Sequence, residues 1–164
     1  MPGFAVLYQA AALCLTYPDD GLRDRLPLLR EAAPQLRGFA DHAAVTTPPD
    51  LQAHYAEVFG SGTPRLLHLG WWGEGDTRRR AVSPARFEER YRAHGLECAD
   101  GQRPDFLPAV LELASRTGDT GLLVEHHDAL ERLRSRLTAL GTPYACVLDA
   151  VCATLPPGTA GARR

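Results

Sequence analysis

Residues 119–140 read DTGLLVEHHDALERLRSRLTAL, and this stretch decides the fold. Its large apolar side chains return at helical spacing, so one side of a helix is apolar and the other is charged. Gly141 follows directly and predicts the end of that helix. We therefore expect one long amphipathic helix from Asp119 to Leu140. Its apolar stripe comprises Leu122, His126, Leu130, Leu133, Leu137 and Leu140, and its polar side comprises Glu125, Asp128, Glu131, Arg132, Arg134 and Arg136.

Helical spacing also continues on both sides of this stretch. The same periodicity predicts helices within residues 4–15, 22–33, 36–43, 50–59, 84–94, 107–114 and 143–155. No run of strand periodicity interrupts it. The sequence thus predicts an all-α, single-domain helical bundle of six or more helices over residues 1–155. Residues 156–164 hold few large apolar side chains, so we expect a disordered C-terminal tail.

Two proline-containing segments predict helix starts. Residues 46–50, TTPPD, place proline in a first helical turn, where its missing N–H is tolerated. Residues 104–108, PDFLP, suggest that Asp105 caps the next helix and that Pro108 is its third residue.

Composition excludes several classes of protein. The net charge of −2 argues against a nucleic-acid binder, which usually carries a basic excess. The four cysteines show no C-x-x-C spacing, which favours reduced thiols and a cytoplasmic location. The apolar run from Phe4 to Leu15 is shorter than a membrane span and lacks a basic leader, so we expect neither a signal peptide nor membrane insertion.

Motifs for catalysis are missing. The chain has no G-x-S-x-G, no G-x-x-x-x-G-K and no H-E-x-x-H. His126 and His127 are adjacent, so on a helix they point about 100° apart and cannot share a metal ion as an i, i+4 pair does. We expect a protein that is not an enzyme and that needs no metal or cofactor. A nucleophile assembled from residues distant in sequence stays an open alternative.

Two neighbouring segments suggest contact with a partner. Residues 66–72, LLHLGWW, hold both tryptophans and predict either core packing or the wall of a groove for a partner helix. Residues 78–80 are three arginines close to Glu74 and Asp76. They predict either a solvated loop with weak ion pairs or recognition of an anion or carboxylate. A nucleotide-dependent factor using residues 78–80, or a helical adaptor or regulator of an unrelated partner, are the alternative functions.

The order of these segments resembles a known family. Tyr17-Pro18-Asp19 is followed by Tyr55, Glu57 and Phe59, then by residues 66–69, LLHL, and residues 75–80, GDTRRR. Residues 104–112, PDFLPAVLE, complete the pattern. It is similar to that of the nitrate reductase molybdenum cofactor assembly chaperones, the NarJ family, within the TorD-like redox-enzyme maturation chaperones. Gly60, Glu74, Ala81 and Arg103 depart from the family pattern.

The resemblance implies an all-helical cytoplasmic chaperone. Its partner would be the N-terminal segment of the apo catalytic subunit of respiratory nitrate reductase, with molybdenum cofactor delivery proteins as further partners. Molybdenum cofactor and iron–sulfur insertion would precede membrane attachment. We expect client contacts from an apolar wall, a charged loop and two acidic residues. These are Tyr55, Phe59, Leu69, Trp71 and Trp72, then Asp76, Arg78 and Arg80, then Asp105 and Glu112.

Overall fold

Helices make up the fold in the computed structural model of the chain, which describes residues 4–72, 84–98 and 101–156. Within these ranges, pairing of the strand type is limited to one antiparallel bridge between His68 and Phe106. The predicted all-α class is confirmed. The helices are α1 (Ala5–Cys14), α2 (Leu22–Ala32), α3 (Arg37–Ala44), α4 (Pro48–Phe59), α5 (Pro84–Ala93), α6 (Leu107–Thr117), α7 (Gly121–Glu125), α8 (His127–Leu140) and α9 (Ala145–Ala153), with 3₁₀ turns η1 (Pro34–Leu36) and η2 (Leu69–Trp72). The tail expected after residue 156 lies outside the described residues.

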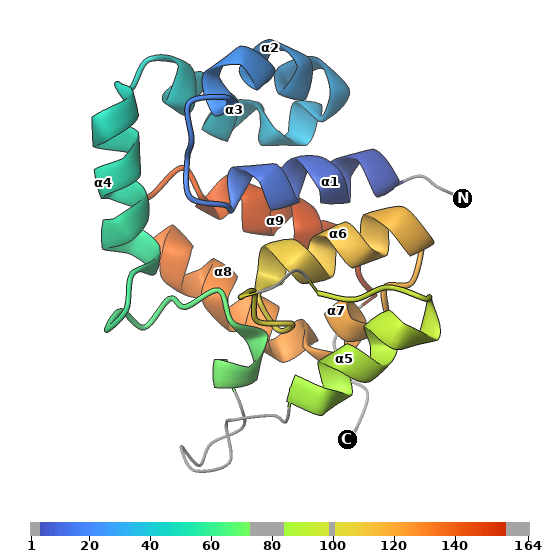
Figure 1. The fold of residues 1–164 in the computed structure, drawn as a ribbon. Coiled ribbons are helices and arrows are strands. Elements are labelled where there is room, and N and C mark those ends of the chain that lie inside the picture. The colour runs from blue at the N-terminus through green and yellow to red at the C-terminus, as the bar shows by residue number, and fades with distance from the viewer. Residues whose placement is uncertain (1–3, 73–83, 99–100, 157–164) are drawn as a thin grey trace.

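Helix α1 lies in the middle of the bundle (Figure 1). It packs along α6 and also contacts α2 and α9. Polar bonds hold both of its ends: the Ser115 hydroxyl donates to the Ala5 carbonyl at 2.8 Å, and the Tyr55 hydroxyl donates to the Leu15 carbonyl at 2.8 Å. Helix α1 therefore packs against α2, α6 and α9, and Tyr55 connects it to α4.

Predicted helix ends agree with the structure at two positions. The Thr47 hydroxyl accepts the Asp50 backbone N–H at 3.3 Å, so Thr47 caps α4 ahead of Pro48 and Pro49. Gly141 ends α8 with φ of 79°, a left-handed conformation that glycine adopts without steric cost.

The long helix predicted from Asp119 to Leu140 is wrong, because the chain breaks at His126 into α7 and α8. The His126 ring stacks on Phe87 with centroids 5.0 Å apart, and its Nδ1 lies 2.9 Å from the Leu122 carbonyl oxygen. That carbonyl also accepts the His126 backbone N–H at 3.1 Å. A side chain bound to its own backbone in this way competes with continuous helix, and here it turns the chain without losing the apolar stripe.

The predicted cap at Asp105 is also wrong. Phe106 holds the N-cap position of α6 without a side-chain hydrogen bond, and Pro108 is the second helical residue, not the third. Asp105 is only 2% exposed. Its carboxylate accepts the Gly70 backbone N–H at 3.0 Å and the Arg103 Nε–H at 3.1 Å. Asp105 therefore fastens turn η2 to the start of α6.

Backbone hydrogen bonds complete this junction. The Leu69 N–H donates to the Asp105 carbonyl at 2.9 Å, and the Leu107 N–H donates to the Leu67 carbonyl at 2.8 Å. Hydrogen bonds therefore join the tryptophan-containing segment, residues 66–72, to the proline-containing segment, residues 104–108. Their proximity positions α6, whose outer face forms part of the site described below.

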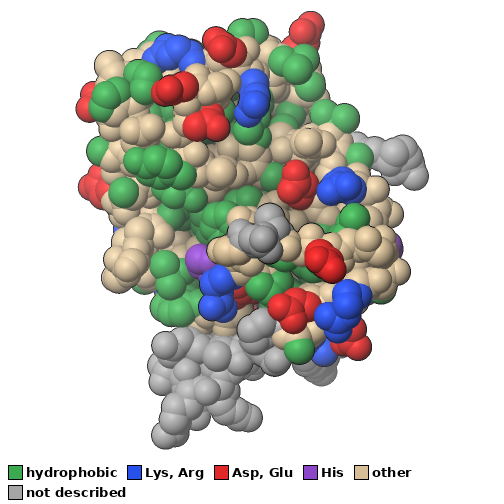
Figure 2. Space-filling view, in the orientation of Figure 1, with side chains coloured by type: hydrophobic (Ala, Val, Ile, Leu, Met, Phe, Trp, Pro, Cys, Tyr) green, Lys and Arg blue, Asp and Glu red, His purple; other side chains and the backbone are tan. Residues whose placement is uncertain are grey.

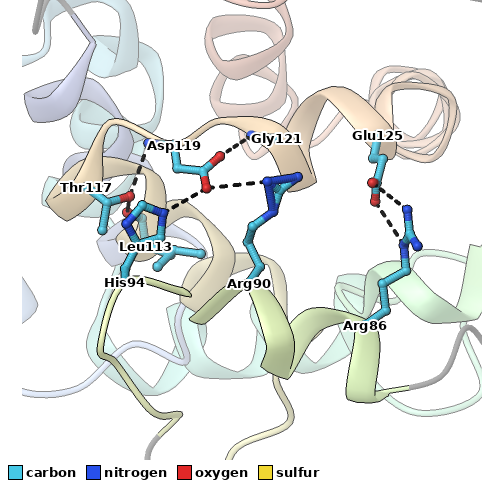
Figure 3. A network of polar contacts seen from close by, with 8 residues as sticks. All are labelled: Arg86, Arg90, His94, Leu113, Thr117, Asp119, Gly121 and Glu125. Atoms are coloured by element: carbon cyan, nitrogen blue, oxygen red, sulfur yellow. Dashed lines mark hydrogen bonds and ion pairs between the residues drawn. The ribbon is translucent and has the colours of Figure 1, made fainter. Parts of the chain in front are cut away.

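Asp119 ties α5 to the corner between α6 and α7 (Figure 3). One carboxylate oxygen lies 2.8 Å from His94 Nε2 and 3.5 Å from Arg90 Nη1, and the other accepts the Gly121 N–H at 2.8 Å. Burial acts to raise the pKa of Asp119, but the hydrogen bonds from His94 and Gly121 and the charge of Arg90 outweigh it. The net effect holds the pKa below its ordinary value of 3.8.

Candidate functional site

A groove opens between α1, α2 and the start of α6, with a volume of about 570 Å³. Helix α1 forms its floor, and α2 and α6 form its walls. Figure 2 shows hydrophobic side chains gathered across the middle of this face, between α2 and α6. The lining is mostly apolar: it includes Val6, Ala10, Leu13, Leu28, Leu29, Ala32, Phe106, Pro108 and Ala109, with Gln9, Thr16, Arg25, Gln102 and Glu112 as its polar members.

Helical periodicity explains why these side chains share one groove. Residues at positions i, i+3, i+4 and i+7 lie on one face of a helix. On α1 those positions are Val6, Gln9, Ala10 and Leu13, and on α2 they are Arg25, Leu28, Leu29 and Ala32. One face of α1 and one face of α2 therefore line the groove.

Large apolar side chains in the groove remain in contact with solvent. Val6 is 56% exposed and Leu28 is 68% exposed. Single exposed apolar residues are ordinary, but a contiguous apolar hollow rimmed by polar groups is typical of a binding site. The volume and the mostly apolar lining of this groove suit one apolar face of a helix or an extended segment.

Of the predicted site residues that the structure describes, only Glu112 lines this groove. Phe59, Leu69 and Trp72 are buried in the core, while Tyr55 and Trp71 are partly buried against it. The Trp72 indole donates to the Leu66 carbonyl at 2.9 Å and lies beneath the guanidinium groups of Arg132 and Arg136, 5.5 and 4.8 Å from the ring centroid. These side chains pack in or against the core, and their contact with a client stays a prediction.

Asp76, Arg78 and Arg80 lie outside the described residues, as does the whole arginine run at residues 78–80. Asp105 is described, and both of its carboxylate oxygens accept hydrogen bonds inside the protein. The charged-loop contacts therefore stay a prediction.

Sequence reasoning missed the groove because its walls come from residues 6–32 and 102–112. One signal was visible. Helix α1 is apolar on nearly all sides: Leu7, Ala11 and Cys14 are buried, while Val6 and Leu13 face the groove. A helix that is apolar all round has more apolar surface than one core contact covers.

The groove offers binding groups but little chemistry. Gln9, Thr16 and Gln102 can form hydrogen bonds, and its two charged members are Arg25 and Glu112. Cys14 lies below on the buried side of α1, where burial and then the neighbouring Cys146 raise the pKa of its thiol, which suppresses the nucleophilic thiolate. Within the described ranges, no three His, Cys, Asp or Glu side chains are grouped as metal ligands are.

The described helices are all too short or too polar to cross a bilayer.

Comparison with known proteins gives the family. The sequence profile of the nitrate reductase delta subunit family matches residues 22–148. The chain is 30% identical over 160 residues to the nitrate reductase-like protein NarX of Mycobacterium tuberculosis strain H37Rv, covering 91% of this chain and 24% of the relative. It therefore spans about a quarter of that relative's length.

Two further relatives are named as chaperones. The chain is 25% identical over 162 residues to the probable nitrate reductase molybdenum cofactor assembly chaperone NarJ of Bacillus subtilis, covering 92% of this chain and 88% of the relative. It is 29% identical over 125 residues to the nitrate reductase molybdenum cofactor assembly chaperone NarJ of Escherichia coli K12, covering 74% and 53%. The resemblance read from the sequence motifs is confirmed, and the chain belongs to the nitrate reductase delta subunit family.

Proposed function

We propose that this chain is a cytoplasmic assembly chaperone that binds the apo catalytic subunit of a respiratory nitrate reductase. The client's N-terminal segment occupies the groove between α1, α2 and α6. The chaperone holds the client while molybdenum cofactor and iron–sulfur clusters are inserted, acts with cofactor delivery proteins, and leaves before membrane attachment. Relatives named as molybdenum cofactor assembly chaperones for nitrate reductase support the role.

The observation that carries the proposal is the exposed apolar lining of the groove. Val6 and Leu28 are exposed in the groove, and a bound segment would bury them. Covering apolar surface contributes about 25 cal/mol per Å² to association before the costs of ordering the partner. A client segment that becomes ordered on binding loses part of that gain, which keeps affinity moderate and release possible.

The test is calorimetric titration with a peptide from the N-terminus of a nitrate reductase catalytic subunit. We expect a Kd between micromolar and nanomolar, which corresponds to roughly −8 to −12 kcal/mol. The heat-capacity change should be negative because apolar surface is buried.

A matched pair of variants locates the binding. Leu28→Asp places a charge in the groove and should abolish most of the affinity. Val45→Asp is its control, because Val45 is 84% exposed and lies outside the groove lining. If neither variant loses affinity, the client binds outside this groove.

A different readout tests the chaperone role against the two alternatives. Deleting the gene should leave nitrate reductase subunits present but inactive and short of molybdenum. Normal reductase activity in a deletion strain that has no second copy would overturn the chaperone assignment. Nucleotide turnover by the pure protein would instead favour the nucleotide-dependent factor, and capture of an unrelated partner together with normal reductase would favour the adaptor.

A further inference from the structure

Two charged side chains stand out in an otherwise neutral groove. Arg25 extends from the α2 wall and Glu112 from the α6 wall, and both are exposed. Among the described residues, neither forms a hydrogen bond or an ion pair with another side chain. Each therefore keeps its full capacity for a charged group on whatever enters the groove.

The directions of the helices place these charges toward opposite ends of the groove. The bond from Ser115 to the Ala5 carbonyl sets the C-terminal half of α6 beside the start of α1, so Glu112, one turn earlier, lies along the first half of α1. Helix α2 follows α1 after a short connection and runs back over it (Figure 1). Arg25, in the first turn of α2, therefore lies toward the C-terminal end of α1.

We propose that Arg25 and Glu112 select the client segment by its charges and fix the direction in which it lies. The partner this describes is an amphipathic segment with one basic and one acidic side chain beside its apolar face. The basic group meets Glu112 and the acidic group meets Arg25. The two groups are about two helical turns apart, or about 10 Å along a helix. This inference rests on the proposed function.

Because both charges are exposed, they contribute to selectivity more than to affinity. A solvent-exposed ion pair adds little affinity, while mismatched charges raise the cost of a wrong partner or a wrong register. Apolar contact with α1 and α2 supplies most of the binding. The two charges decide which segment binds and which end of it lies over the start of α1.

The experiment uses a designed helical peptide with one apolar face, an arginine and, seven positions later, a glutamate. Its Kd is measured by fluorescence anisotropy with the whole chain. Glu112→Arg should weaken binding by about three- to tenfold, since an attraction becomes a repulsion. A second peptide with glutamate in place of the arginine should recover that loss on the Glu112→Arg protein. Glu88→Arg on α5, outside the groove, is the matched control and should leave the Kd unchanged.

Direction is tested by the double reversal Arg25→Glu with Glu112→Arg. The designed peptide should regain nearly its original affinity but lie end for end. A nitroxide on the peptide N-terminus should then broaden NMR signals at one end of α1 in the wild-type protein and at the other end in the double variant. A merely structural role for the two residues would not move the label.

The outcomes separate this inference from the proposed function. Equal affinity of the designed peptide for all charge variants overturns charge selection, and so does failure of the designed peptide to bind while the natural nitrate reductase segment binds. Failure of the natural segment to bind overturns the proposed occupant itself. Affinities that follow charge matching, with a label that changes ends, support the inference.

Discussion

At the scale of single residues, Asp105 shows how a recognisable sequence signal can serve a different structural purpose. A proline-flanked aspartate before an apolar run is typical of a helix cap. Here the same carboxylate is buried and bonded to the Gly70 N–H and to Arg103. Local sequence cannot reveal this, because the Gly70 donor lies 35 residues away along the chain.

Replacing Asp105 tests that junction. Asp105→Ala should lower the free energy of unfolding by about 2–3 kcal/mol, since it leaves the buried Gly70 N–H without an acceptor. Asp105→Asn keeps an acceptor oxygen and should lose less, because the Arg103 side chain is 59% exposed. Urea denaturation measures both, and equal midpoints for all three proteins would contradict the assignment.

His42 gives a residue-scale prediction for pH. Burial, and then the neighbouring His54, lower the pKa of His42 below its ordinary 6.5. The unfolded chain therefore takes up a proton first as the pH falls, so this contribution to stability is complete above pH 6.5 and is lost below it. His42→Gln should flatten the decline of the thermal midpoint below about pH 6.5. Parallel declines in circular dichroism melts of the variant and the wild type would show that His42 is not responsible.

At the scale of the elements, periodicity predicted most helices because each buries a face of regular spacing. It placed the start of α5 correctly, while the prolines of residues 46–50 marked the start of α4 and Gly141 marked the end of α8. It failed at His126, where the stacking partner Phe87 belongs to another helix. The break leaves the apolar stripe in phase, so no pattern within residues 119–140 could disclose it.

The attachment of α5 can be tested at its polar contacts. Asp119→Asn should cost about 1 kcal/mol of stability, after allowance for partial exposure of the carboxylate and its partners. Because the pKa of Asp119 is lowered, its contribution is present above pH 3.8 and is lost as the pH falls below that value. Hydrogen exchange of α5 amides should quicken. Glu125→Gln breaks the more exposed pair with Arg86 in the same region and is the control, with a smaller expected effect.

At the scale of the whole molecule, the site follows from packing and not from any motif. Val6 and Leu28 are distant from Glu112 in the sequence, and the position of α1 between α2 and α6 brings them together. The sequence predicted a partner-binding helical protein and one groove residue. The groove itself requires relative helix positions, which periodicity does not contain.

A pair of variants distinguishes the core from the groove. Trp72→Ala removes a side chain that is 5% exposed and should lower stability by about 3–5 kcal/mol. Leu28→Asp changes a surface side chain and should leave the thermal midpoint within a few degrees while client binding is lost. Melting curves and titrations of both proteins measure the contrast. A stable Trp72→Ala protein that no longer binds would return the client to the tryptophan segment.

The packing of α1 also determines when the groove can form during synthesis of the chain. Its Tyr8 hydroxyl lies 2.7 Å from the Thr154 hydroxyl, 146 residues later, and its groove needs α6 as a wall. At about 5–20 residues per second, a nascent chain waits roughly 5 to 20 s after α1 emerges before that wall exists. Folding that depends on such distant pairings is slow to complete. The groove is therefore complete only after α6 has been synthesised and packed against α1, and a segment that binds the groove can engage the chain only from that point on.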